Sequence, residues 1–445
     1  MAVVYSQSIV PYQVLQRDFS SQGVNVKLNN GKSKFYSVGG PYTIDNKKNI
    51  MVGDVWALAG QSNMRGNGFF KDPWSNKTVE KLIHQSTFHL FDMKEKWAIA
   101  KDPIHQLSQS IRKVNKMISD PTVADPGLSL VRGGSLALSF AKKYQELMQL
   151  QLKVKSLPIG LIASAHGGVS LEQWSTTLLR DTPQWKNESL YGAMLARIES
   201  STSGTNKIAG ILWYQGESDT GNMTAATTYG SRMTSWIKSA RTDLGNSKLN
   251  VIQVQLAREV TTLDTDEGWN SVRNSQAELM DNNIGAVSSI DCPLDDRIHL
   301  SLTGEYMVGK RVAVSAQAAI NNKASTASPQ ILISSIKFEQ KVISGVTKTY
   351  SIKILFKNLG GKFVDVDLVQ GFSIRDEDGI DQELIYRTAF YEGNKVVRLL
   401  LSDAAKKLTK KTMYLYYGYG NNPICNIVST NGMGLLTSGP IPITF

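Results

Sequence analysis

The chain is poor in cysteine and histidine, with two cysteines and five histidines in 445 residues. Two distant cysteines, Cys292 and Cys425, make no disulfide framework, and we interpret them as lone thiols. The histidines stand in no His-Glu-x-x-His or paired-cysteine pattern, and the chain also lacks a Walker A loop and a Rossmann glycine fingerprint. The sequence therefore predicts a protein that works without a metal or another cofactor.

Long apolar runs are also missing, so we expect no membrane insertion. The first residues, MAVVYSQSIV, lack the basic start and apolar core of a signal peptide, which leaves the compartment open. The net charge is +11, but the basic residues are dispersed, which is typical of a solvated surface. We therefore predict no nucleic-acid partner. The sequence leaves the oligomeric state unknown.

Composition changes twice along the chain, because all eight tryptophans lie between Trp56 and Trp269. Residues 1–50 contain short strand-like pieces and form a predicted N-terminal β region. Residues 51–322 alternate between buried strands and amphipathic helices, which indicates a parallel sheet covered on both faces. The expected strands are 55–59, 159–163, 208–214, 251–256 and 286–290, and the clearest helices are 135–149 and 305–320.

A linker-like stretch at 321–329 is followed by short alternating runs between Gly, Asn and Asp, which predict an antiparallel β-sandwich over 330–445. The predicted fold class is therefore α/β: an α/β/α sandwich with a central parallel sheet, a C-terminal β-sandwich and a short N-terminal β region. We expect the N-terminal strands to pack against that sandwich.

The first chemical segment is Gly60-Gln-Ser62-Asn-Met64, directly after a buried strand. Ligands bind at the carboxyl ends of parallel strands, so Ser62 is placed to be a nucleophile with its own N–H ready for an oxyanion. An ordinary helix cap is the alternative for this serine. The segment is not the Gly-x-Ser-x-Gly elbow, since Met64 replaces the second glycine.

Two further strands end in polar or glycine clusters. Gly167 and Gly168 follow one strand, where a backbone N–H can approach a ligand closely, although a plain tight turn fits equally well. The neighbouring His166 is better explained as a wall or structural histidine. After Trp213-Tyr, the amide of Gln215 is a good oxyanion donor, and Glu217 could orient a partner or receive substrate hydroxyls.

The last segment places Asp296 three residues before His299. On a turn this spacing lets the carboxylate hold the imidazole tautomer, so that the histidine can accept a proton from Ser62. Taken by itself, this segment could equally be an Asp–His pair on the protein surface with no catalytic role. Together, however, the four segments supply a nucleophile, a backbone donor, an amide donor and a base, which make a complete acyl-transfer site.

These blocks resemble the SGNH hydrolases, specifically the sialate O-acetylesterase and carbohydrate esterase family 6 group. The resemblance covers nearly the whole chain. The matching segments are Gly60-Gln-Ser-Asn-Met64, Gly167-Gly168 with Leu171-Glu-Gln-Trp174, Trp213-Tyr-Gln-Gly-Glu-Ser-Asp219, Asp296-x-x-His299, Val14-Leu-Gln-Arg-Asp18, Gly39-Gly-Pro-Tyr-Thr43 and Tyr417-Gly-Tyr-Gly-Asn-Asn-Pro-Ile-Cys-Asn426.

The resemblance implies Ser62 as nucleophile, His299 as general base and Asp296 as its orienting acid, with Glu217 as the rival acid. It implies an oxyanion hole from the N–H groups of Ser62 and Gly168 (or Gly167) and the side chain of Gln215. The implied reaction is hydrolysis of acetyl esters on the hydroxyls of a carbohydrate, with the sialate O-acetylesterase type favoured.

The sequence departs from that family in features that bear on the sugar specificity and leave the reaction unchanged. The N-terminal β region is short, an insertion between the second and third blocks is absent, and His166 stands where many sialate esterases have tryptophan. These features bring the core nearer to acetylxylan esterases, which is the first alternative. The second is a glycan-binding protein with a vestigial esterase site.

Overall fold

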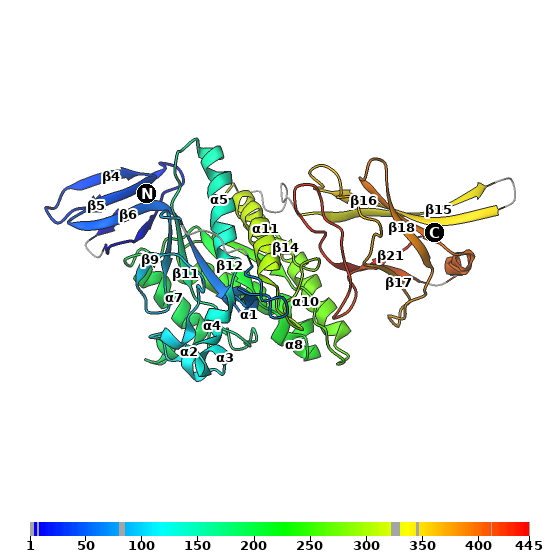
Figure 1. The fold of residues 1–445 in the computed structure, drawn as a ribbon, viewed down its shortest axis with the longest axis horizontal. Coiled ribbons are helices and arrows are strands. Elements are labelled where there is room, and N and C mark those ends of the chain that lie inside the picture. The colour runs from blue at the N-terminus through cyan, green and yellow to red at the C-terminus, as the bar shows by residue number, and fades with distance from the viewer. Residues whose placement is uncertain are drawn as a thin grey trace.

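The computed structural model describes residues 4–6, 9–79, 85–321, 330–343, 347–410 and 412–444. Over these ranges the chain forms one nine-stranded sheet and four smaller sheets. In Figure 1 the N-terminal strands lie at one end of the molecule and the C-terminal β region at the other, with the helix-covered sheet between them. Among the described residues, none of the helices combines the length and apolar character that crossing a membrane requires.

The central sheet has the strand order β14-β13-β12-β6-β11-β8-β9, and every pair along this order is parallel except β8–β9. This confirms the parallel sheet expected from the sequence. Every residue of β11 and β12 is buried, as expected for strands covered on both faces. The strands are β6 (Lys47–Gly60), β8 (Phe88–Phe91), β9 (Trp97–Ile99), β11 (Ile159–Ala163), β12 (Gly210–Tyr214), β13 (Asn250–Gln255) and β14 (Ile284–Ser288).

The two helices foreseen from periodicity, α5 (Ala137–Leu152) and α11 (Leu302–Ile320), pack against each other and against the sheet. A Cβ at Gly309 would lie 1.9 Å from Ser139 Oγ, so glycine permits their close approach. The other helices are α1 (Ser62–Arg65), α2 (Val114–Met117), α3 (Pro121–Ala124), α4 (Leu128–Val131), α6 (Trp185–Glu188), α7 (Leu190–Ser201), α8 (Met223–Thr227), α9 (Tyr229–Asp243) and α10 (Asp266–Glu278), with 3-10 turns at η1 (Leu107–Gln109), η2 (Glu217–Asp219) and η3 (Asp403–Lys410).

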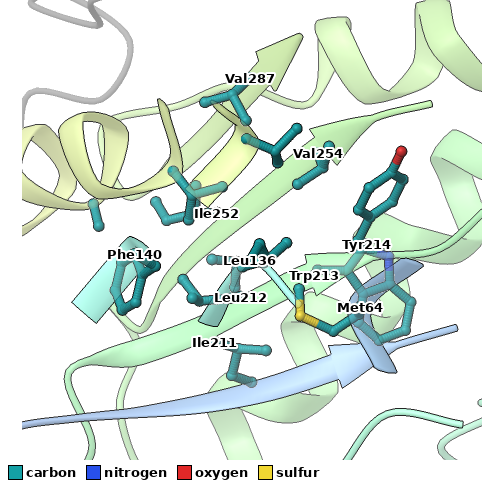
Figure 2. Close-up of a cluster of buried hydrophobic side chains, with 14 of the residues drawn as sticks. Met64, Leu136, Phe140, Ile211, Leu212, Trp213, Tyr214, Ile252, Val254 and Val287 are labelled. Carbon is teal, nitrogen blue, oxygen red and sulfur yellow. The ribbon is translucent and has the colours of Figure 1, made fainter. Parts of the chain in front are cut away.

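The main hydrophobic core lies between the sheet and its helices. Figure 2 shows Leu212 and Ile252 of the sheet facing Leu136 and Phe140, with Met64 from the turn after β6 at the same layer. These side chains are fully or almost fully buried. Burial of this kind stabilises the fold by about 25 cal/mol per Å² of apolar surface removed from water. The turn that carries Ser62 is thereby fixed to the core on its inner side.

The N-terminal region is built onto β6, which runs for 14 residues from that region into the central sheet. Its first half pairs with β2 (Val14–Gln16) and β5 (Gly39–Ile44), while β1 (Val4–Ser6), β3 (Gly23–Lys27) and β4 (Ser33–Ser37) form a separate sheet beside it. The expectation that these strands pack against the C-terminal sandwich is therefore wrong. The unbroken buried run from Ile50 to Gly60 keeps the strand continuous and carries the region to the opposite end.

The C-terminal region consists of two antiparallel sheets, with orders β15-β16-β19-β18 and β17-β20-β21. The predicted antiparallel β architecture is confirmed, while the linker at 322–329 lies outside the described residues. The strands are β15 (Leu332–Ile343), β16 (Thr347–Lys357), β17 (Phe372–Arg375), β18 (Ile385–Tyr391), β19 (Val396–Leu401), β20 (Tyr414–Tyr417) and β21 (Ser438–Pro442). A two-stranded sheet of β7 (Gly68–Phe69) and β10 (Arg132–Gly134) completes the fold.

Candidate active site

Ser62 stands at the first position of α1, and only Gln61 separates it from the end of β6. The turn requires glycine at position 60, where φ is +137° and a Cβ would lie 2.1 Å from the carbonyl oxygen of Tyr214. Gln61 then accepts hydrogen bonds from the N–H groups of Gly216 and Ser218 at 3.4 and 3.3 Å. The sheet neighbour β12 thus fixes the backbone that presents Ser62.

A continuous chain of polar contacts joins Ser62, His299 and Asp296. The Ser62 Oγ lies 3.0 Å from His299 Nε2, and His299 Nδ1 lies 2.7 Å from Asp296 Oδ2. The other carboxylate oxygen of Asp296 accepts from the backbone N–H groups of Ile298 and His299, at 3.0 and 2.8 Å. Because these bonds close a tight turn, the three-residue spacing does bring the two side chains together, as the sequence analysis expected.

The environment of Asp296 favours its ionised form. Burial opposes ionisation, but the hydrogen bond and the charge of His299 outweigh it and hold the pKa of the Asp296 carboxyl well below its ordinary value. Arg132 adds a contact, because its Nη2 lies 3.0 Å from Asp296 Oδ2 and 3.2 Å from His299 Nδ1. The arginine is also held by Asn67 Oδ1, at 3.1 Å.

Glu217 lies elsewhere in the same site, where its partner is Asn63. The Asn63 amide donates to Glu217 Oε1 at 2.7 Å, and the Asn63 oxygen accepts from the N–H of Leu300 at 3.0 Å. Asn63 therefore ties the Ser62 turn to the residue after His299. The other oxygen of Glu217 is buried and makes no hydrogen bond in the described structure.

Burial raises the pKa of Glu217 to about 7, against the opposing hydrogen bond from Asn63. A carboxyl whose pKa is higher in the folded than in the unfolded state stabilises the fold least at high pH. As the pH rises from 4.5, the ordinary pKa of this carboxyl, to above 7, the wild type should lose about 3 kcal/mol of stability relative to a Glu217→Gln variant. Denaturant unfolding of both proteins at pH 4 and pH 8 measures this difference, and a pH-independent difference would contradict it.

Two glycines after β11 line the cavity beside Ser62. A Cβ at Gly167 would lie 2.0 Å from Asp120 Oδ2, so that position has no room for a side chain. Gly168 has φ of +67°, is exposed, and has no atom within 4 Å of the position a Cβ would take. Among the hydrogen bonds of the described residues, none uses the N–H of Ser62 or of Gly168. Both groups are thus free to donate to a ligand.

Gln215 is not brought to the cavity. It is fully buried, and its Nε2 donates to Asp219 Oδ2 at 2.7 Å and to the carbonyl oxygen of Val169 at 3.1 Å. Its side-chain oxygen accepts from Tyr229 at 3.2 Å. In this arrangement the Gln215 side chain is bonded to other protein groups outside the cavity lining. Its role as an oxyanion donor stays a prediction. His166 is also buried, with ring nitrogens close to the carbonyl oxygens of Gly167 and Asn115.

The cavity has a volume of about 480 Å³ and is lined by charged groups that are mostly paired. Its three arginines each contact a carboxylate: Arg65 with Asp120, Arg132 with Asp296, and Arg297 with Glu259. Glu217 adds a fourth carboxyl group without a cationic partner at the site. Within the described residues, no group of three or more metal-binding side chains is present.

The arginines and the two asparagines of this site were given no functional role from the sequence. Asn63 and Asn67 stand beside Ser62 in the chain, so proximity to the serine was an available signal. Arg132 had none, because it comes from β10, a three-residue strand outside every motif. The pairing of β10 with β7 brings it to Asp296.

The fold is α/β with a central parallel sheet, in which a serine follows the end of a central strand and an Asp–His turn lies beside it. The chain belongs to the carbohydrate esterase family described as sialic acid-specific acetylesterase, whose sequence model matches residues 52–318.

Individual relatives agree with that family. A probable carbohydrate esterase of Arabidopsis thaliana is 29% identical over 281 residues, which are 61% of this chain and 92% of the relative. A solved structure, a carbohydrate acetylesterase of Xanthomonas citri, is 19% identical with a TM-score of 0.62 and covers 97% of this chain and 98% of its own. At that identity, the likeness shows the fold.

Proposed function

We propose that this chain hydrolyses acetyl esters on sugar hydroxyls, with Ser62, His299 and Asp296 as its catalytic triad. The observation that carries the proposal is the chain of contacts from Ser62 Oγ through His299 to Asp296, at 3.0 and 2.7 Å. With Nδ1 protonated and donating to Asp296, the Nε2 lone pair of His299 faces the serine hydroxyl.

In the first half-reaction, Ser62 Oγ bonds to the acetyl carbonyl carbon and its proton passes to His299 Nε2. The N–H groups of Ser62 and Gly168 receive the oxyanion. When the ester C–O bond breaks, His299 returns the proton to the sugar oxygen, leaving an acetyl-serine. Water then attacks this ester with His299 as base, and acetate leaves with Ser62 restored. Asp296 stays ionised throughout and stabilises the imidazolium.

Arg132 supports this triad by its hydrogen bond to Asp296. Replacement by glutamine keeps a polar side chain but removes the charge, and we expect kcat/KM to fall roughly tenfold, the cost of a partly exposed charged hydrogen bond. Steady-state kinetics on p-nitrophenyl acetate measure the effect, with Arg132→Lys as the variant that keeps the charge. Equal rates for wild type and Arg132→Gln would remove Arg132 from the mechanism.

The sialate O-acetylester is the substrate that the sequence favours, but the cavity favours a second candidate. A sialic acid carries a carboxylate, and each arginine of the cavity already contacts a carboxylate of the protein. Glu217 adds a further carboxyl group without a cationic partner, so it offers an anionic sugar no attraction. These charges suit an acetylated neutral polysaccharide such as xylan.

Acetate release from O-acetylated sialic acid and from acetylated xylan, measured side by side, tests the proposal. Turnover of either substrate supports an acetylesterase, and the preferred one identifies the sugar. Binding of both without turnover would instead support a glycan-binding protein with a vestigial site.

A further inference from the structure

One segment of the C-terminal β region reaches the wall of the candidate active site. It is the 418–422 turn, Gly418-Tyr-Gly-Asn-Asn422, which follows β20. We propose that this turn is part of the catalytic apparatus: it positions the 256–260 segment of the cavity wall, and through that segment the loop that carries Asp296 and His299. The inference rests on the proposed esterase function.

Arg273 of α10 joins the turn to the wall segment from the inside. The arginine is fully buried. Its guanidinium donates to the carbonyl oxygens of Gly418 and Gly420 in the turn, at 3.3 and 2.5 Å. It also donates to the carbonyl oxygens of Leu256, at 3.1 Å, and Ala257. A buried guanidinium with all these partners is costly to disturb, because any lost bond leaves a charged donor unsatisfied.

A second set of bonds connects the turn to the cavity itself. The N–H of Glu259 donates to the carbonyl oxygen of Asn421 at 2.8 Å. Glu259 is a cavity residue, and its carboxylate pairs with Arg297, which immediately follows Asp296. The next N–H, of Val260, donates to the carbonyl oxygen of Arg297 at 2.7 Å. The turn, the wall segment and the Asp296–His299 loop are thus joined by backbone bonds.

The turn is seated on the start of α10. Asp266 Oδ1 accepts from the N–H of Asn421, and Asn270 Oδ1 accepts from the N–H of Gly420, both at 2.8 Å. Gly420 has φ of +88°, and a Cβ there would lie 2.6 Å from Asp266 Oδ1. A side chain at this position must therefore displace either the turn or the Asp266 carboxylate that holds the N–H of Asn421. The 418–422 turn is thus bonded both to the start of α10 and to the cavity-wall segment.

Two pairs of variants in the full-length chain test the proposal. Gly420→Ala is compared with Gly393→Ala, since Gly393 also has positive φ (+67°) but no atom within 4 Å of its would-be Cβ. Asn270→Ala is compared with Asn274→Ala, which removes a bond from the same helix to the carbonyl oxygen of Gly439, away from the turn. If Gly420→Ala does not fold, the asparagine pair decides alone.

The first readout is amide exchange, which is independent of catalysis. We expect faster exchange at the N–H groups of Val260 and His299 in Gly420→Ala and Asn270→Ala, with β11 unchanged, and wild-type exchange in both controls. Equal exchange in variants and controls overturns the proposal. This readout holds even if the wild type turns over no acetyl ester, an outcome that would defeat only the proposed function.

The second readout is the rate on p-nitrophenyl acetate. Misplacing a catalytic group by a fraction of an ångström to one ångström lowers turnover on the order of tenfold to a hundredfold. We expect that loss in kcat for Gly420→Ala and Asn270→Ala, with KM little changed, and near wild-type kinetics in the controls. Faster exchange without a loss of kcat would show that the wall moves independently of the triad, and would overturn the catalytic role.

Discussion

Ser62→Ala is expected to reduce acetate release by a factor on the order of ten thousand or more, because the nucleophile that forms the acyl intermediate is lost. The hydroxyl is held 3.0 Å from His299 Nε2, at the end of a buried strand. Removing it leaves the oxyanion donors in place, so some rate above that in water will remain. Acetate release by wild type and variant on a common ester measures the change.

A serine-directed fluorophosphonate provides the matching control. It should label the wild type at Ser62 and leave Ser62→Ala unlabelled, while both proteins unfold at the same temperature. Full turnover in a folded Ser62→Ala variant would contradict the triad. It would leave Ser62 with the alternative role of an ordinary residue at the start of α1.

Asp296→Asn should lower kcat roughly a thousandfold to ten-thousandfold, because asparagine can favour the wrong imidazole tautomer and cannot balance the charge of the imidazolium. The contact that makes this effect large is the 2.7 Å bond between Asp296 Oδ2 and His299 Nδ1. The same substitution at the rival position, Glu217→Gln, keeps an oxygen for the Asn63 amide and should cost far less.

The two variants are matched, since each replaces a carboxylate by its amide in the same cavity. Rates on p-nitrophenyl acetate over a range of pH separate them. If Glu217→Gln loses activity and Asp296→Asn keeps it, the acidic partner is Glu217 and the observed Asp296–His299 contact is structural. Equal large losses would mean that both carboxylates act in the reaction.

The sequence predicted the parts of this fold that depend on local periodicity. Strand β11 matches the expected 159–163, and α5 and α11 lie within a few residues of their predicted spans. A continuous buried run or a regular apolar stripe is visible in the chain itself. The position of the N-terminal strands could not be predicted from the sequence, because the pairing of β2 and β5 with β6 depends on long-range contacts that no local pattern specifies.

The site divides in the same way. The serine, the Asp–His spacing and the glycine pair are local features, and the sequence singled them out by the chemistry of residues at strand ends. That Asp296 rather than Glu217 contacts His299, and that the Gln215 amide is bonded to Asp219, depend on side-chain directions in the folded chain. Sequence order cannot encode which of two nearby carboxylates reaches an imidazole.

The sequence by itself determined the class of chemistry and the layered architecture, because strand and helix periods and residues at strand ends are properties of short segments. Only the tertiary structure decided that Arg132 contacts Asp296 and that Arg273 joins the C-terminal turn to the cavity wall. Both arginines meet their partners across more than a hundred residues of chain. Such contacts are fixed by the packing of whole elements, so no short segment of the sequence reveals them.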